Sequence, residues 1–329
     1  MGKAAAMEVK RLRGGIDLGG TKMQAIVAGE DHRVVGQARE PTPTAGGPDD
    51  VVDGLERVLR EAAAQAGVDP ADLAGVGVGA PGAIDDDAGT LARAGNLPGW
   101  RDPYPLVAEL GGRLRTRVRL GNDVQVATDA EFTLGAAREF GSLLGVFWGT
   151  GVGGGIVLDG RPWLGRGAAG EIGHVVVKPG GAQCPCGRRG CMEAYAGRRA
   201  MEQRARRAHQ RGEKTHLFKI MEEKGRDRLT SGIWARALER GDELAQRIID
   251  EAVDAIGIGV ASACNVLDVE AVIVGGGLGV RFGEPYVRRI EHAMMPHLFA
   301  DDRPPTVRLA ELGDLGGALG AALLVADAA

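Results

Sequence analysis

Short apolar runs alternate with glycine turns in the first part of the chain. Residues 14–29 have the pattern of two strands joined by a glycine turn, and residues 33–43 continue as a third strand that ends at two prolines. Helical spacing follows over residues 48–66, with acidic residues in the first turn. Residues 73–85 and 115–123 are two further predicted strands, and the second leads directly into a helix over 123–140. This order of elements predicts an α/β domain.

The second part of the chain opens in the same way. Residues 143–160 form two β-type runs around a glycine turn, and the pattern then predicts these elements: an exposed helix over 193–224, a long helix over 241–268, a buried strand and glycine loop over 269–279, and a strand and helix over 306–328. The repeated opening predicts two similar domains that face each other across a cleft. We assign residues 13–122 and 310–329 to a small domain, 123–309 to a large one, and 1–12 to a disordered lead-in.

Composition narrows the function classes. The chain has 329 residues, enough for two domains, and 44% hydrophobic with 26% charged residues is typical of a soluble globular protein. Forty basic and forty-four acidic residues give a net charge of −4, which indicates neither a nucleic-acid nor a membrane partner. The first residues lack the apolar region of a secretory signal, and no long apolar run appears. We therefore expect a cytoplasmic protein.

Glycine is the compositional outlier. There are 54 glycines in 329 residues, about twice the usual share of ~7%, and they gather at 14–20, 79–82, 149–155, 275–279 and 313–320. Two glycine hairpin turns with exposed backbone N–H groups can hold a polyphosphate between them. Asp17 precedes the first turn, and a carboxylate beside phosphates needs a bridging cation, so it is a candidate Mg²⁺ partner. A plain tight hairpin turn is the alternative for either turn alone.

Three of the four cysteines lie within one loop, and a histidine precedes them. Cys184, Cys186 and Cys191 follow His174 closely, and three thiolates with one imidazole complete a tetrahedral zinc shell. A disulfide with one spare thiol is the alternative, which the short spacings and the expected reducing compartment disfavour. A full shell leaves no position for water, so we predict one structural zinc ion per chain.

Eight motifs together resemble the ROK family of sugar kinases and repressors, in particular its glucokinase-like, zinc-containing members. The resemblance spans about residues 12–325 and rests on DLGGTK (17–22), GAPGAID (79–85), NLPGW (96–100), GNDVQVATDAE (121–131), GTGVGGG (149–155), GEIGH (170–174), CPCGRRGC (184–191) and VGGG (274–277). It implies an actin-like ATPase fold of ribonuclease-H-like topology, in which ATP and Mg²⁺ phosphorylate the 6-hydroxyl of a hexose. Glucose is the expected sugar, and the resemblance implies a homodimer or homotetramer.

The resemblance also implies roles for individual residues. Asp123 matches the general base. The implied sugar-binding residues are Asn96, Asn122, Asp123, Glu171, His174, Glu193 and Gly82. The implied nucleotide-binding residues are Asp17, Gly19, Gly20, Thr21, Lys22, Gly149, Thr150, Gly151, Gly153 and Gly276. The zinc ligands are His174, Cys184, Cys186 and Cys191, and the second ring nitrogen of His174 is then left to donate a hydrogen bond to a sugar hydroxyl.

Some alternatives stay open at this point. Asp123 stands where a strand meets a helix and could be the helix N-cap, although Asn122 can fill that role and leave Asp123 as the base. Gly121 stands where the family commonly has glutamate, and Val124 and Val126 where it has small residues; these departures flank the base without removing it and bear on the preferred sugar, not on the reaction. The alternatives for function are a kinase for fructose, mannose or an N-acetylhexosamine, or a sugar-responsive regulator. Only 16 residues precede Asp17, too few for the helix-turn-helix module of a repressor.

Overall fold

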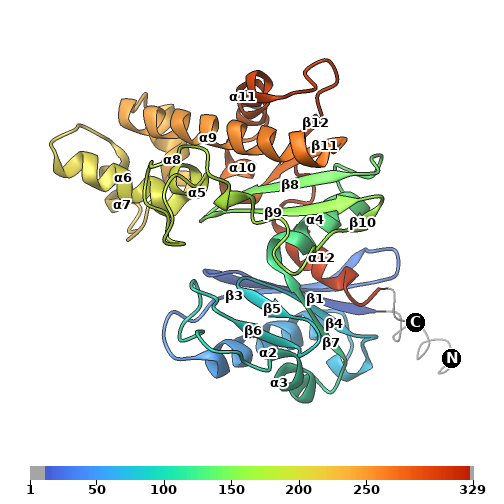
Figure 1. Cartoon of the computed structure of the whole chain (residues 1–329). Coiled ribbons are helices and arrows are strands. Elements are labelled where there is room, and N and C mark those ends of the chain that lie inside the picture. Colours follow the sequence, from blue (N-terminus) through green and yellow to red (C-terminus); the bar gives the residue numbers. More distant parts are fainter. Residues whose placement is uncertain (1–11, 327–329) are drawn as a thin grey trace. The chain divides into compact units, whose positions relative to one another are not determined.

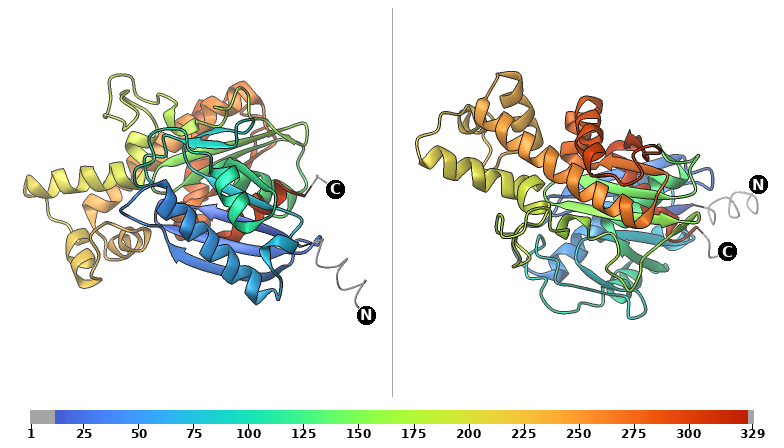
Figure 2. Two further views of the ribbon diagram at one scale, coloured as in Figure 1. Left: turned by 90° about the horizontal axis from the view of Figure 1, so that it is seen from below. Right: turned by 45° about the horizontal axis from the view of Figure 1, so that its top comes forward.

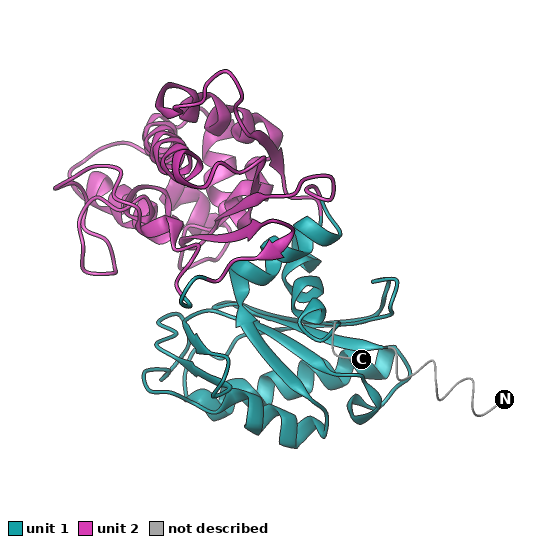
Figure 3. Cartoon of the chain, turned by 45° about the vertical axis from the view of Figure 1, so that its right-hand side comes forward, with its two compact units in different colours: residues 1–135, 165–167, 312–329 teal, residues 136–164, 168–311 magenta. Residues whose placement is uncertain are grey.

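The computed structural model describes residues 12–326. These residues form two compact units (Figure 3): unit 1 comprises residues up to 135, residues 165–167 and residues from 312 onward, and unit 2 comprises residues 136–164 and 168–311. The boundary expected from the sequence, at residue 122, placed the helix after Asp123 in the other domain. That helix, α4 (Asp123–Thr133), packs against α12 (Gly316–Leu323) and belongs to unit 1 by its contacts.

Unit 1 is a five-stranded mixed sheet with helices on both faces (Figure 1). The strand order is β3-β2-β1-β4-β7, with β1 antiparallel to β2 and parallel to β4. The sheet strands are β1 (Arg13–Leu18), β2 (Lys22–Ala28), β3 (Val34–Pro41), β4 (Val76–Ala80) and β7 (Val118–Asn122). Helices α2 (Pro48–Gln65) and α3 (Leu106–Leu114) cover one face, and α4 and α12 cover the other. A small hairpin, β5 (Ala83–Asp85) and β6 (Thr90–Ala92), and a 3₁₀ turn, η1 (Pro70–Asp72), complete the unit with η4 (Gly313–Leu315).

Unit 2 repeats the same sheet plan. Its strand order is β10-β9-β8-β11-β12, with β8 antiparallel to β9 and parallel to β11. The strands are β8 (Leu143–Trp148), β9 (Val152–Leu158), β10 (Arg161–Pro162), β11 (Ala271–Gly275) and β12 (Thr306–Leu309). The helices are α5 (Glu193–Ala196), α6 (Arg198–Gln210), α7 (Leu217–Glu223), α8 (Ser231–Glu239), α9 (Glu243–Leu267), α10 (Gly276–Phe282) and α11 (Glu284–Met294), with 3₁₀ turns η2 (Ile172–His174) and η3 (Met295–His297). The yellow helices α6 and α7 are easiest to follow in Figure 2.

The predicted α/β class and the repeated strand–turn–strand opening are confirmed, but two predicted elements were wrong. Residues 193–224 are not one exposed helix: Gly197 separates α5 from α6, a loop separates α6 from α7, and Met201 and Ile220 are fully buried. The glycine-rich segment after β11 is not a loop either, because α10 begins at Gly276. The sequence pattern also missed α3 and the β5–β6 hairpin. No helix within residues 12–326 is both long and apolar enough to cross a membrane.

Candidate functional site

The first glycine turn joins β1 to β2 in unit 1. The Gly19 N–H donates to the Lys22 carbonyl over 2.9 Å, and the Thr42 hydroxyl donates to the Gly19 carbonyl over 2.6 Å. A Cβ built on Gly20 would lie 2.9 Å from the Asn96 Cβ, so a predicted nucleotide residue and a predicted sugar residue are neighbours here. Thr21 at the tip of the turn is exposed.

Asp17 lies on β1, two residues before Gly19. Burial raises the pKa of its carboxyl group to about 6, and the nearby positive charge of Lys22 opposes that rise. Within the described chain no hydrogen bond is made to this carboxylate, while Lys22 itself forms an ion pair with Asp314 over 3.3 Å. A bound cation would stabilise this half-buried carboxylate, because its positive charge offsets the loss of hydration.

The end of β7 supplies the candidate base. Asn122 is the N-cap of α4, and its side-chain oxygen accepts the N–H groups of Val124 and Gln125, each over 3.0 Å. Asp123 is the first residue of the helix, and its Oδ1 also accepts the Val124 N–H, over 2.9 Å. The helix is therefore capped by the residue before Asp123, as the sequence allowed, and the Asp123 carboxylate is not needed as the cap.

Two glycines of unit 1 have packing roles: Gly82, a predicted site residue, and Gly121, a departure from the family pattern. A Cβ built on Gly121 would lie 2.8 Å from Val126 and 3.0 Å from Leu324, so apolar side chains fill the space where a glutamate would begin. Gly82 has a φ of +107° and would meet the Ala92 carbonyl at 2.7 Å. The positive φ and this close approach of the backbones explain why position 82 is a glycine.

The second glycine turn, Gly149–Gly151, joins β8 to β9 in unit 2 and is held by the first turn of α6. The Gly149 N–H donates to Gly151, and the carbonyls of Gly149 and Thr150 accept the backbone N–H groups of Arg198 and Arg199 over 3.1 and 3.2 Å. The Trp148 indole donates to the Ala196 carbonyl over 2.7 Å, which fixes the end of β8. The turn therefore has a rigid support on its helical side.

The remaining predicted glycines of unit 2 border this turn. Gly276 has a φ of +79°, and a Cβ there would lie within 2.8 Å of the Trp148 backbone. The next residue, Gly277, places its backbone nitrogen 3.8 Å from the Cβ position of Gly149. Gly153 pairs with Phe147 within the β8–β9 ladder. The start of α10 and the Gly149–Gly151 turn are thus brought together by glycines that allow the backbones to touch.

Polar side chains predicted to bind sugar also gather at this turn. The Glu193 carboxylate accepts the Val152 N–H over 2.9 Å. The segment that carries Glu171 and His174 packs onto the start of β9, because a Cβ on Gly173 would lie only 2.0 Å from the Val152 carbonyl. The Nε2 atom of His174 lies 3.8 Å from Oε2 of Glu171. Unit 2 therefore holds acidic and imidazole groups beside the Gly149–Gly151 turn.

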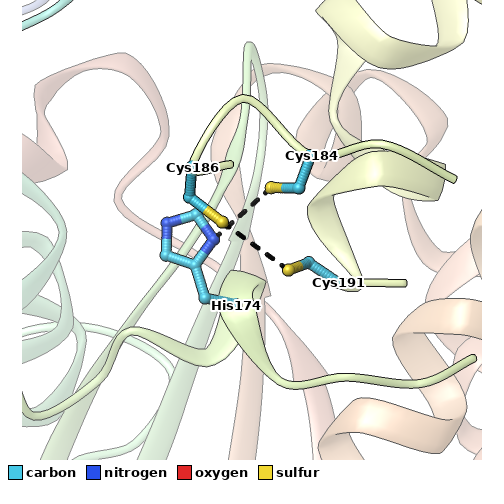
Figure 4. Close-up of side chains that lie close together, drawn as sticks. All are labelled: His174, Cys184, Cys186 and Cys191. Atoms are coloured by element: carbon cyan, nitrogen blue, oxygen red, sulfur yellow. Dashed lines mark hydrogen bonds between the residues drawn. The ribbon is translucent and has the colours of Figure 1, made fainter. Parts of the chain in front are cut away.

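The cysteine-rich loop brings its predicted metal ligands together (Figure 4). The ligand atoms of His174, Cys184, Cys186 and Cys191 all lie within 4.8 Å of one another. The Nδ1 atom of His174 lies 3.7 Å from Sγ of Cys184, and the Sγ atoms of Cys186 and Cys191 are 3.7 Å apart. All four cysteines of the chain are free thiols, so the disulfide alternative is wrong for this structure. Nδ1 faces the sulfurs, and Nε2 points toward Glu171 instead.

Backbone hydrogen bonds also hold this loop. The Gly187 N–H donates to the Cys184 carbonyl over 3.0 Å, and the Met192 N–H donates to the Val175 carbonyl over 2.9 Å. Burial raises the pKa of the Cys184 thiol to about 12, so a bound cation is what would keep it as a thiolate. The donor set fits a tetrahedral Zn²⁺ ion of the Cys₃His type.

One residue at the second turn was not expected. Arg198 donates from Nη2 to the Thr150 hydroxyl over 3.0 Å, although the two residues are 48 positions apart in the sequence. The sequence pattern gave Arg198 no role, because it lies in an arginine-rich segment typical of a solvated helix. Only the tertiary contact distinguishes it from its neighbours.

The predicted site residues thus form two groups. Asp17, the Gly19–Lys22 turn, Gly82, Asn96, Asn122 and Asp123 lie in unit 1. The Gly149–Gly151 turn, Gly153, Glu171, Glu193, Gly276 and the His174–cysteine cluster lie in unit 2. Within each unit, most members of the group lie in or beside one glycine turn.

Comparison with known proteins identifies relatives that align with almost the whole chain. A glucokinase of Thermotoga maritima is 31% identical over 95% of this chain and 96% of its own length. An N-acetyl-D-glucosamine kinase of Pectobacterium atrosepticum is 34% identical over 94% of this chain and 97% of its own length. The crystal structure of a ROK family glucokinase from Streptomyces griseus, in complex with glucose and AMPPNP, is 32% identical, has a TM-score of 0.81 and covers 95% of this chain and 98% of its own.

Such solved relatives share the actin-like ATPase fold that the sequence motifs implied. The family model described as the ROK family matches residues 13–328, which is nearly the entire chain. The motifs, the repeated sheet plan and the full-length relatives agree, and this chain belongs to the ROK family.

Proposed function

We propose that this protein is an ATP-dependent hexose kinase that transfers the γ-phosphoryl group of ATP to the 6-hydroxyl of glucose. The observation that carries the proposal is the contact between Glu193 and the Gly149–Gly151 turn. A carboxylate suited to sugar hydroxyls accepts the N–H of Val152 at the end of a phosphate-type turn. Phosphoryl transfer needs donor and acceptor to be positioned side by side, and this contact supports such an arrangement within unit 2.

In this proposal Asp123 is the general base. One carboxylate within hydrogen-bond reach of the 6-hydroxyl is enough to accept its proton as the phosphoryl group arrives. The capping of α4 by Asn122 supports this role, because it removes the main structural reason for an aspartate at position 123. Asn96 and Asn122 are proposed to bind other hydroxyls of the sugar.

The metal sites have separate roles. Zn²⁺ bound by His174, Cys184, Cys186 and Cys191 would supply a structural clamp rather than a reactive centre, since four protein ligands leave no open position. Nδ1 of His174 faces the sulfurs, so Nε2 is the nitrogen left to donate to a sugar hydroxyl beside Glu171. Asp17 is proposed to bind Mg²⁺ through water, with the two glycine turns as donor-phosphate sites.

A kinase for an N-acetylhexosamine is the second candidate. The N-acetyl-D-glucosamine kinase of Pectobacterium atrosepticum is as similar to this chain as the glucokinase of Thermotoga maritima, at 34% against 31% identity. We propose a homodimer or homotetramer located in the cytoplasm, where a reducing environment keeps the thiols of Cys184, Cys186 and Cys191 free for metal binding.

The test is a coupled assay with ATP and Mg²⁺ across glucose, mannose, fructose, N-acetylglucosamine and N-acetylmannosamine. We expect the highest kcat/KM with glucose and a product that carries phosphate on O6. A higher value for an N-acetylhexosamine selects the second candidate. Absence of phosphorylation with every sugar of the panel rejects the kinase proposal.

A further inference from the structure

Arg198 brings a positive charge to the Gly149–Gly151 turn. It is the first residue of α6, and its side chain is half-buried. Nη2 donates to the Thr150 hydroxyl over 3.0 Å, and Nη1 donates to the Leu229 carbonyl over 3.1 Å. The guanidinium is therefore held beside the tip of the turn by two neutral acceptors.

Among the described residues, no carboxylate forms an ion pair with this guanidinium. Glu202 is the acidic group that acts on it most strongly, but its two oxygens are already bound: Oε1 accepts two N–H groups of Arg206, over 2.7 and 2.9 Å, and Oε2 accepts the Leu229 N–H over 3.0 Å. Burial lowers the pKa of Arg198, and although Glu202 opposes this, the charges of Arg228 and Arg199 lower it further. The local field is thus positive and only partly neutralised.

A cation placed in this way favours an anion from outside the protein. A guanidinium carries five N–H donors, and only two of them are used here. Removing a charge from water is unfavourable unless it is paired, and three unused donors in a planar fork match the oxygens of a phosphate. The adjacent turn already presents backbone groups of the kind that approach phosphates.

We infer that Arg198 binds the phosphate chain of the phosphoryl donor at the Gly149–Gly151 turn. The inference rests on the proposed kinase function and adds a side-chain contact to a site otherwise built from backbone and the Thr150 hydroxyl. The exposed side chains of Arg199 and Arg228 contribute attraction for the same polyanion, although only the backbone of Arg199 is bonded to the turn. The chemistry recognised is a chain of phosphates, whether it belongs to a nucleoside triphosphate or to an inorganic polyphosphate.

A purely structural role makes different predictions from a binding role. If Arg198 only fastens Thr150 to Leu229, its loss should reduce kcat or thermal stability while donor affinity and its salt dependence stay unchanged. If Arg198 contacts phosphate, its loss should weaken donor binding, and the remaining binding should depend less on ionic strength because one charge contact is missing.

The experiment compares the full-length zinc-loaded protein with R198M, R198K and the matched control R207M, which removes an exposed arginine from the same helix. We expect R198M to raise the KM for MgATP by about 10-fold or more, with the KM for glucose within about 2-fold. R198K should lie between wild type and R198M, since an ammonium group keeps the positive charge but not the planar fork of donors. R207M should match wild type within about 2-fold.

Direct titration with inorganic tripolyphosphate then tests phosphate binding without turnover. We expect R198M to lose tripolyphosphate affinity by the same factor as its rise in ATP KM, and to show a shallower salt dependence. If R198M binds tripolyphosphate as tightly as wild type does, the inference is overturned. This holds even if the variant has a lower kcat or a higher KM for ATP. If the wild type phosphorylates no sugar but binds tripolyphosphate through Arg198, the kinase proposal fails while the phosphate site stands.

Discussion

The two glycine turns begin from the same local design and differ in their charged surroundings. Each joins the first two antiparallel strands of a five-stranded sheet, and in each sheet the first strand of the hairpin also pairs in parallel with a strand from later in the chain. The Gly19–Lys22 turn follows a half-buried carboxylate, Asp17, on β1. The Gly149–Gly151 turn has instead a half-buried guanidinium, Arg198, which reaches the Thr150 hydroxyl from the start of α6.

Under the proposed function, this difference gives the two turns different roles. A turn beside a carboxylate attracts a phosphate only through an intervening cation, so the first turn suits Mg²⁺-bridged phosphate. A turn beside a guanidinium can bind phosphate directly. The second turn also receives Glu193, which connects it to the cysteine-rich loop, whereas the first turn is bordered by Asn96 and Thr42.

The largest expected effect is a loss of kcat at Asp123, which lies outside both turns. D123N should lower kcat by at least about 10²-fold, because the 6-hydroxyl then loses its proton acceptor, while the KM for glucose changes little. The matched control is D129N on the same helix, where burial raises the pKa of the carboxyl to about 7 and the Gln125 amide donates to it over 2.7 Å. Near-normal turnover in D123N would show that the base lies elsewhere.

The next prediction distinguishes the role of the cysteine-rich loop from the role of the second turn. C186S should remove one zinc ligand, lower the zinc content of the purified protein and raise the KM for glucose by about 10-fold or more, while the KM for ATP changes less. C264A is the control, because Cys264 is buried in α9 away from the metal ligands, and it should keep its zinc. Wild-type protein without zinc, or normal glucose binding in C186S, would contradict the clamp role of the metal.

The sequence was informative where local patterns determine structure. Alternating apolar positions and glycine turns predicted both hairpins, and the spacing of Cys184, Cys186 and Cys191 from His174 predicted a cluster that the structure brings together. Asn122 and Asp123 illustrate the same point, since a cap and its neighbour are decided within one turn of helix.

Features that depend on distant contacts were not predictable in this way. The arginine-rich segment 193–224 resembles one exposed helix, yet its apolar residues at 201, 205 and 208 face a core formed with α9 and other elements. Nothing near Arg198 in the sequence indicates Thr150 as its partner. The assignment of α4 to unit 1 likewise follows from packing against α12, which lies at the other end of the chain.

A smaller effect is the influence of the Asp17 charge, beside the first turn, on the pH dependence of stability. The pKa of Asp17 is raised from 3.8 to about 6, so the folded state binds this proton more tightly than the unfolded state does. Its contribution to stability is therefore present below about pH 4 and lost as the pH rises through about 6, a change of at most about 3 kcal/mol.

The D17N variant removes this titration. Without Mg²⁺ we expect its Tm at pH 8 to exceed that of wild type by at least about 2 °C, with no advantage at pH 4, while its Mg²⁺-dependent activity falls. Thermal unfolding from pH 4 to 8 checks this, with D86N, an exposed acid of the same unit, as control. A D17N protein that is less stable at pH 8 would mean that the Asp17 charge is favourable in the folded state.

The smallest effect compares the two turns directly through one methyl group in each. A Cβ on Gly151 would lie 2.2 Å from Oε2 of Glu193, whereas a Cβ on Gly19 would lie 3.1 Å from the Lys22 carbonyl. G151A must therefore displace the Glu193 carboxylate from the Val152 N–H, and we expect the KM for glucose to rise about 3- to 10-fold, the worth of about one hydrogen bond. G19A requires only a shift of a few tenths of an ångström and should leave the KM for glucose unchanged, with at most a modest rise in the KM for MgATP.

Steady-state kinetics with each substrate varied in turn give both values. An equal loss of glucose binding in the two variants would mean that the turns differ in charge alone, and that the contact between Glu193 and the second turn does not position the sugar.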